Sequence, residues 1–258
     1  MRVPLGPLAP GVLVAVADFM ITTTTVVVAR DHSCLVVDPA VTVADLRALA
    51  ANLRARGLAA AAGFATHSHW DHVLWSAELG AVPRYASAAT EADARRLRDT
   101  LIGETRAAAP GHDPGLIGRL APLPAGASGV PWDGPETRLV IHDGHAAGHT
   151  ALFLPAAGVL LAGDMCSDAE IPLLDLAGRD PIGDYRAGLA RLADMTGLNW
   201  VVPGHGSPGD TAEFRRRVAA DLRYLDALER GDDLSDPRLT SDWLRETHQA
   251  QLSYARSR

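Results

Sequence analysis

Residues 66–72 read Thr66-His67-Ser68-His69-Trp70-Asp71-His72 and hold four closely spaced candidate metal ligands. Neutral imidazoles and carboxylates are the side chains that bind Zn²⁺, Fe²⁺ or Mn²⁺ in proteins. A surface loop that is rich in histidine by chance would explain one such residue. It does not explain a whole string of ligand types, so this stretch predicts a metal site.

The apolar segment 58–66 comes directly before this motif and is predicted to be a buried strand. Side chains alternate along an extended chain, so we expect His67 and His69 to point the same way. A turn after them can bring Asp71 and His72 to a second metal position nearby. A strand that ends in a loop of ligands is a rigid scaffold for such a site.

Three further candidate ligands lie beside predicted strands. Gly148-His149-Thr150 comes just before a strand at 152–154, Gly163-Asp164 closes the apolar run 159–162, and Gly204-His205-Gly206 follows the strand at 199–202. If these strands share a sheet, each turn brings one ligand to the same edge. His142 and His145, which flank Gly144, are interpreted as neighbours of the site that touch substrate at most.

The rest of the chain alternates between strands and helices. Short β-branched strands are predicted at 12–17, 22–29 and 34–37, after a lead-in rich in Pro and Gly. A helix is expected from Thr42 to Gly57, and the remaining helices are expected at 73–79, 87–106, 183–196, from Asp210 onward, and at 240–255. Residues 107–136 are predicted to be a loop. Strands followed by a helix occur in both halves, which predicts two packed sheets with helices on both outer faces.

The series H-x-H-x-D-H, G-H-T, L-A-G-D and P-G-H-G, in this order between about Asp38 and Gly206, resembles the metallo-β-lactamase superfamily. The resemblance implies an α/β fold, a four-layer αββα sandwich with its metal site at one edge. We expect one domain over residues 1–258, in which 207–258 form a C-terminal helical part.

The same resemblance implies two divalent metal ions, with zinc expected and iron or manganese as alternatives. It assigns the first metal to His67, His69 and His149. It assigns the second metal to Asp71, His72 and His205, with Asp164 bridging both. Asp38 matches an acidic residue that supports the ligands from behind in this family, and an ordinary Asp-Pro turn is the alternative interpretation.

A hydrolytic mechanism follows from that ligand set. Two metal ions would lower the pKa of a shared water, giving hydroxide at cellular pH, and would polarise a carbonyl oxygen. Asp71 is expected to orient this nucleophile while it binds metal, so it is the predicted catalytic residue. The expected reaction is hydrolysis of an ester, thioester or lactone-like bond in a small molecule. Cys166, close after Asp164, is interpreted as a packing thiol.

Two other functions stay open at this point. A mononuclear-iron persulfide dioxygenase would use only His67, His149 and Asp164. A non-catalytic metal-binding module is the other, and the complete ligand set argues against it. A secreted β-lactamase usually carries a lysine for the drug carboxylate, and this chain contains no lysine.

Composition restricts the partners and the compartment. The net charge is −7 and 47% of the residues are hydrophobic, which allows a large core and disfavours a nucleic-acid partner. Cys34 and Cys166 form no disulfide framework and are expected to be unpaired. The apolar run at 12–17 is too short to span a membrane, and prolines interrupt its likeness to a signal peptide. We expect a cytoplasmic protein that acts on a small molecule, without a membrane partner.

Overall fold

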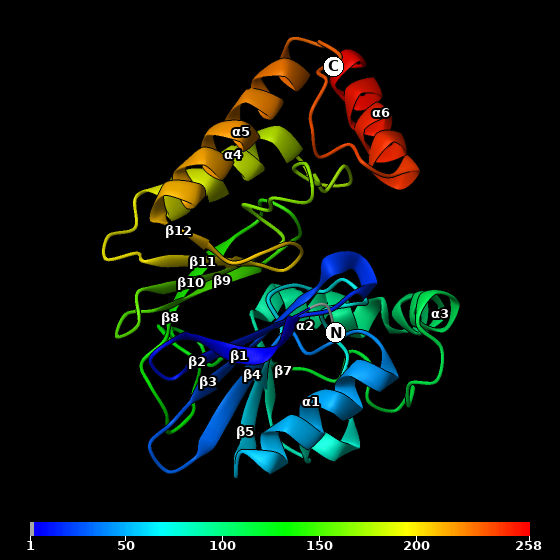
Figure 1. The fold of residues 1–258 in the computed structure, drawn as a ribbon. Coiled ribbons are helices and arrows are strands. Elements are labelled where there is room, and N and C mark those ends of the chain that lie inside the picture. The colour runs from blue at the N-terminus through cyan, green and yellow to red at the C-terminus, as the bar shows by residue number, and fades with distance from the viewer. Residues whose placement is uncertain (1–2) are drawn as a thin grey trace.

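The computed structural model describes residues 3–258, which form two β-sheets packed face to face with helices on both outer faces (Figure 1). The first sheet contains seven strands in the order in which they occur in the chain. They are β1 (Val3–Ala9), β2 (Val12–Val16), β3 (Thr23–Val28), β4 (Ser33–Val37), β5 (Ala59–Phe64), β6 (Arg84–Ala86) and β7 (Ala121–Pro122). Strands β1 to β4 pair antiparallel, and β4 to β7 pair parallel.

The second sheet contains five strands in the order β12-β11-β10-β9-β8. They are β8 (Arg138–His142), β9 (His149–Leu154), β10 (Val159–Gly163), β11 (Trp200–Pro203) and β12 (Gly209–Asp210). Only β10 and β11 pair parallel, so both run toward the same edge of this sheet. The turns after them therefore meet at that edge.

Helices cover the outer face of each sheet. Helix α1 (Val43–Ala55) begins where the Thr42 side chain accepts a hydrogen bond from the backbone of Asp45, and its leucines pack on β3 and β4. Helices α2 (Ala88–Arg96) and α3 (Arg98–Ala108) lie near the end of the same sheet. The second sheet is covered by α4 (Pro181–Ala193), α5 (Thr211–Glu229) and α6 (Asp242–Arg256).

The core between the two sheets is apolar and comes from both. Leu35 and Phe64 of the first sheet lie in one buried cluster with Leu152, Leu161 and Val202 of the second. Two more clusters lie under the helices on either side. The predicted four-layer αββα sandwich with a C-terminal helical part is therefore confirmed.

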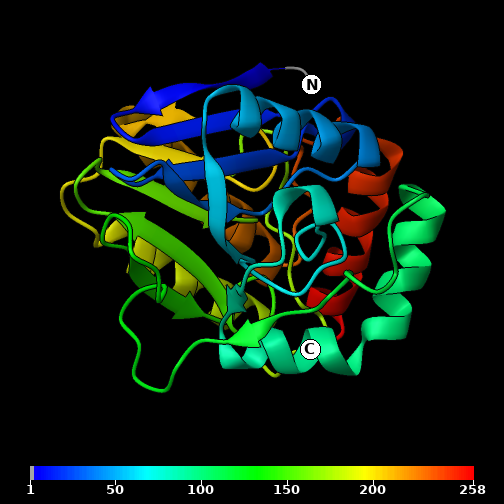
Figure 2. The ribbon, with the colours of Figure 1, turned by 90° about the horizontal axis from the view of Figure 1, so that it is seen from below.

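Several predicted elements differ in detail. The lead-in rich in Pro and Gly forms β1, because a strand at the edge of a sheet tolerates the missing amide hydrogens of Pro4 and Pro7. Within the predicted helix at 73–79 there is only a short 3₁₀ turn at Ala77–Leu79, preceded by extended backbone at Ser76. The helix predicted at 87–106 is divided at Leu97, and α2 and α3 run in clearly different directions (Figure 2).

Backbone contacts tie the two sheets together at one edge. The amide of Thr23 donates to the carbonyl of Gly204 at 2.7 Å, and the amide of Gly206 donates to the carbonyl of Ile21 at 2.9 Å. The turn that leads into β3 is thus joined to the loop after β11. No helix within residues 3–258 is long and apolar enough to span a membrane.

A buried ion network fixes the segment between α5 and α6. The Arg238 guanidinium donates to Asp221 of α5 at 2.5 Å and to both oxygens of Asp236 at 3.0 Å. All three side chains are at most 8% exposed. Burial raises the pKa of Asp221 to about 6, against the opposing effect of Arg238. The guanidinium therefore compensates the negative charge of the Asp221 carboxylate, whose burial would otherwise be unfavourable.

Arg238→Ala should lower the free energy of unfolding by about 3–5 kcal/mol, because it leaves the buried charge of Asp221 without its partner. Urea unfolding followed by circular dichroism measures this. Arg230→Ala is the matched control, since Arg230 pairs with Asp232 on the surface, where both side chains are more than half exposed. Equal effects of the two substitutions would show that the buried network contributes no special stability.

Candidate metal centre

Histidines and carboxylates converge where the loops after β5, β8, β10 and β11 meet. Most of the converging side chains are buried, although His69 is exposed. They form two neighbouring groups of candidate ligands.

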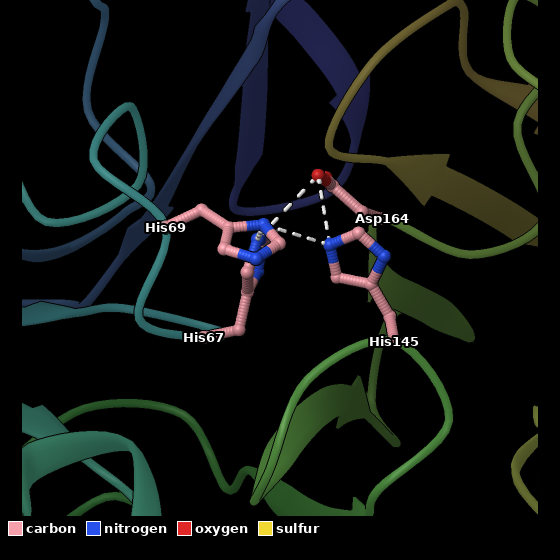
Figure 3. A group of neighbouring side chains, drawn as sticks. All are labelled: His67, His69, His145 and Asp164. Carbon is pink, nitrogen blue, oxygen red and sulfur yellow. Dashed lines mark hydrogen bonds and ion pairs between the residues drawn. The ribbon is translucent and has the colours of Figure 1, made fainter. Parts of the chain in front are cut away.

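The first group contains His67, His69, His145 and Asp164 (Figure 3). His69 Nδ1 lies 3.1 Å from His67 Nε2 and 3.0 Å from His145 Nε2. One Asp164 oxygen, Oδ2, lies 3.4 Å from His67 Nε2 and 3.5 Å from His145 Nε2. Three ring nitrogens and a carboxylate oxygen thus face one small volume, as ligands of a single ion would.

His149 does not take part in this group, although it is predicted from the sequence as a ligand of the first metal. Its Nε2 accepts a hydrogen bond from the backbone amide of Asp164 at 3.1 Å, so the lone pair that a metal needs is used. Its ring stacks between His67 and His142. The sequence offers two Gly-His pairs, Gly144-His145 and Gly148-His149, and the structure brings His145 to the other ligands.

The second group contains Asp71, His72 and His205. His205 Nε2 lies 3.1 Å from Asp71 Oδ2 and 3.3 Å from His72 Nε2. Asp164 lies between the two groups, since its Oδ1 is 3.2 Å from His72 Nε2 and its Oδ2 is 3.5 Å from His205 Nε2. The position of Asp164 suits a carboxylate shared by two ions.

Glycine at position 204 is required for this close packing. A Cβ atom there would overlap the Asp164 carboxylate and come within 2.8 Å of the His72 ring. The Pro-Gly-His-Gly sequence after β11 therefore brings His205 to the site and also leaves room for the ligands opposite it.

Hydrogen bonds from behind fix which ring nitrogen faces the centre. His205 Nδ1 donates to the carbonyl of Met20, and His145 Nδ1 donates to the carbonyl of Leu173, both at 2.9 Å. A proton on Nδ1 leaves the Nε2 lone pair free to bind a metal. Both rings are thus held in the tautomer that a ligand needs.

Asp38 supports the site as the resemblance implies. Its carboxylate accepts hydrogen bonds from the backbone amide of Thr66 at 2.9 Å and from the Thr66 hydroxyl at 2.7 Å. Its Oδ2 lies 3.0 Å from His72 Nδ1. Asp38 has a positive φ of 45°, a strained backbone that the surrounding contacts maintain.

The electrostatics of the two groups differ. Burial lowers the pKa of His67 well below its ordinary value and that of His145 to about 3, so both rings are neutral. Burial also lowers the pKa of His205, but Asp164 and Glu170 outweigh it and raise the value to about 10. Burial opposes ionisation of Asp71, but His72 and His205 lower its pKa to about 2.

These features fit divalent cations. Asp164 Oδ1 is buried and receives no hydrogen bond, which is costly unless a cation or another donor binds it. The positive charge that the carboxylates draw onto His205 is charge that a metal ion would supply instead, with release of a proton. The donor set of imidazoles and carboxylates suits zinc, iron or manganese.

Sequence reasoning missed Glu170, which forms a third candidate group with Asp164 and His205. Glu170 Oε1 lies 3.8 Å from His205 Nδ1, and burial raises the pKa of Glu170 to about 7. It lies in the loop between β10 and α4, where no spacing rule points to a ligand. Its nearness to the centre arises from the tertiary fold.

A cavity of about 600 Å³ opens over the centre, and His69, Asp71, Asp164 and His205 line it. Trp70 also lines this cavity. Trp75, in contrast, is buried in the core. Both candidate metal groups are therefore open to a ligand from the same side.

Cys34 and Cys166 are both buried and unpaired, as predicted. Cys166 lies in the core under the second sheet, among apolar side chains, and not in the cavity. The expectation that it is a packing thiol is consistent with this position.

Comparison with known proteins identifies a matching family and several structures of similar fold. A family model of the metallo-beta-lactamase superfamily matches residues 18–224. A metallo-beta-lactamase family protein of Thermus thermophilus is 23% identical with a TM-score of 0.69, over 96% of this chain and 93% of that chain. A beta-lactamase domain protein of Burkholderia ambifaria is 21% identical with a TM-score of 0.68, over 88% of this chain and 78% of that chain.

A third similar structure, TTHA1623 in a di-iron-bound form, is 22% identical with a TM-score of 0.61, over 79% of this chain and 97% of that chain. No curated protein matches the chain. At these identities the solved structures show the fold alone, and the family match covers the segment that contains every candidate ligand. The chain belongs to the metallo-β-lactamase superfamily.

Proposed function

We propose that this protein is a dinuclear metal-dependent hydrolase that cleaves an ester, thioester or lactone-like bond of a small molecule. One observation carries the proposal. Two complete groups of ligands lie side by side with Asp164 between them, and both open into one cavity of about 600 Å³. A cavity of this size accommodates a small molecule.

In this proposal the first ion is held by His67, His69 and His145, with His145 in the position predicted from the sequence for His149. The second ion is held by Asp71, His72 and His205, and Asp164 binds both. When bound, such ions lower the pKa of a coordinated water toward neutrality and polarise an acyl oxygen. Zinc is the proposed metal, with iron or manganese as alternatives.

The protein's own groups position the reactants. The Asp71 carboxylate lines the cavity and is held at 3.1 Å from His205 Nε2, so it can accept a hydrogen bond from an attacking water and orient it. The cavity lining also includes apolar side chains such as Leu97, Leu101 and Leu173. No serine or cysteine nucleophile is needed, and the buried Cys166 does not reach the cavity.

The alternatives receive less support. A mononuclear-iron persulfide dioxygenase would not need the second group, which is buried and complete. A non-catalytic module would not need an open cavity over both groups. Iron itself stays an alternative metal, because one protein of similar fold was determined in a di-iron-bound form.

We also propose a small-molecule substrate without a nucleic-acid or membrane partner, on the basis of the net charge of −7. The two buried free thiols suit a reducing compartment such as the cytoplasm.

The parent protein should bind close to two divalent ions per chain, and Asp164→Ala should lower the occupancy of both positions, because one carboxylate serves both. Elemental analysis by mass spectrometry, after loading with zinc and removal of free metal, measures the ratio. A variant that keeps two tightly bound ions would contradict the bridging assignment.

His145→Gln should reduce the metal content to about one ion per chain, whereas His149→Gln should keep both ions. The same substitution at the two positions makes each variant the control of the other. In His149→Gln the amide oxygen of the new side chain can also continue to accept a hydrogen bond from the Asp164 backbone. The reverse result would restore His149 as the ligand.

Asp71→Asn should lower kcat on the order of 10²-fold or more on the ester or thioester that the parent hydrolyses, because one positioning interaction at the developing charge is lost. The loss should fall on kcat more than on KM. Kinetics are compared at equal metal content, with Asp99→Asn on the exposed surface of α3 as control. A folded, metal-loaded Asp71→Asn variant with the parental kcat would remove Asp71 from the catalytic machinery.

A further inference from the structure

Part of the cavity lining comes from helices that are far apart in the sequence. Helix α6 contributes Trp243 and Thr247, α3 contributes Thr100 and Glu104, and the loop between β10 and α4 contributes Asp175 among others. Figures 1 and 2 show α3 and α6 on the same side of the molecule but apart from each other, α3 near the first sheet and α6 near the second. We call these residues the wall of the cavity, and the candidate metal ligands that line it the floor.

Much of this lining is apolar or aromatic. Trp70 and Trp243 both line the cavity, and Trp243 on α6 is 50% exposed although it is a large aromatic side chain. An exposed tryptophan at the mouth of a cavity is free to offer its ring face to a ligand. The π-face of an indole attracts cations, most strongly when they lie within about 6 Å of the ring centre.

The charged groups of the lining are predominantly negative. Apart from the metal-ligand aspartates, four carboxylates line the cavity, those of Asp93, Glu104, Glu170 and Asp175. The lining contains one guanidinium, Arg96, and it already pairs with Asp93 at 2.6 Å. These two charges cancel locally.

Glu104 and Asp175 keep their negative charge, although Glu104 also interacts electrostatically with the ring of His69. Within residues 3–258 neither side chain forms an ion pair with a basic group. Asp175 Oδ1 accepts a backbone hydrogen bond from Ala177 at 3.1 Å, which shapes the loop but leaves the charge in place. A ligand group near the mouth therefore meets two carboxylates and an aromatic face.

We propose that this pocket selects a substrate that carries an ammonium group at the end away from the scissile carbonyl. The inference rests on the proposed hydrolase function and adds the substrate class to it. The carbonyl would lie on the floor beside the metal ligands, and the ammonium would lie between Trp243, Glu104 and Asp175. Aromatic faces combined with carboxylates are the groups that recognise ammonium ligands.

An anionic substrate fits this lining poorly. A carboxylate or phosphate group at the mouth would face Glu104 and Asp175, and the one guanidinium in the lining is engaged by Asp93. Like charges in juxtaposition suppress binding of the wrong ligand. The pocket thus discriminates by charge as well as by size.

Binding of matched hydroxamates to the zinc-loaded protein tests the proposal. Three compounds of equal chain length are used, ending in trimethylammonium, in tert-butyl or in sulfonate, so that the hydroxamate anchors each one at the metals. Calorimetry should give the tightest binding for the ammonium compound and the weakest for the sulfonate, with a difference on the order of tenfold or more. Added sodium chloride should narrow that difference. Tightest binding of the sulfonate or of the tert-butyl compound would overturn the proposal.

Variants assign the effect to the named groups. Glu104→Gln and Asp175→Asn should each weaken binding of the ammonium compound about two- to fivefold, as expected for partly exposed charges. Trp243→Ala should weaken it, and Trp243→Phe should restore part of the loss. Glu246→Gln is the control, because it removes the same charge from an exposed position of α6 outside the cavity lining. If Glu246→Gln weakened binding of the ammonium compound equally, the preference would arise from the net charge of the protein, and the proposed pocket would be contradicted.

The hydroxamate binding measurements test this inference independently of the proposed hydrolase function. If the ammonium preference is present and depends on Glu104, Asp175 and Trp243, the pocket is supported even when no ester or thioester is hydrolysed, and only the hydrolase proposal then fails. If esters are hydrolysed but the three compounds bind alike, the hydrolase proposal stands and the ammonium pocket is wrong.

Discussion

The candidate metal centre depends on hydrogen bonds that hold the histidine rings from behind. His205 and His145 each donate a proton to a backbone carbonyl, those of Met20 and Leu173, so that the opposite nitrogen of each ring faces the centre. Met20 has a positive φ of 52°, a costly conformation for a non-glycine residue. The strained turn before β3 therefore orients a ligand that lies far along the chain. Distortion of the turn would alter metal binding without removing any ligand.

The fold and most of the centre could be predicted from the sequence because they follow local patterns. His67, His69, Asp71 and His72 occur in one string after an apolar strand, and the structure brings them to the centre. Asp164 and His205 follow strands that pair parallel, which places both at the same sheet edge. Candidate ligands that follow directly after strands could be predicted from the sequence, because the sheet topology determines where they lie.

The remaining features depend on tertiary contacts that no local pattern records. Of the two Gly-His pairs, His145 lies with the other candidate ligands, whereas the His149 ring accepts a hydrogen bond from the amide of Asp164, fifteen positions away. Glu170 comes near His205 only because its loop passes over the site. The prolines in β1 disfavour a strand, but the edge of a sheet accommodates them. In each case the outcome depends on a contact with a part of the chain that is distant in the sequence.

The proposed metal ligands and part of the proposed ammonium pocket lie in different segments of the chain. The superfamily match ends at residue 224, after every candidate ligand, whereas Trp243 and Thr247 of the cavity wall lie beyond it. Gln251 of α6 accepts the amide of Leu174 at 2.7 Å and donates to the Tyr224 hydroxyl at 2.8 Å, so it joins α6 to α5 and to the cavity loop. Because that loop also supplies the Leu173 carbonyl behind His145, the wall and the ligands are mechanically coupled. If the proposed pocket is correct, changes at Trp243 would alter which molecule is bound, whereas changes at Gln251 would also affect the loop behind His145.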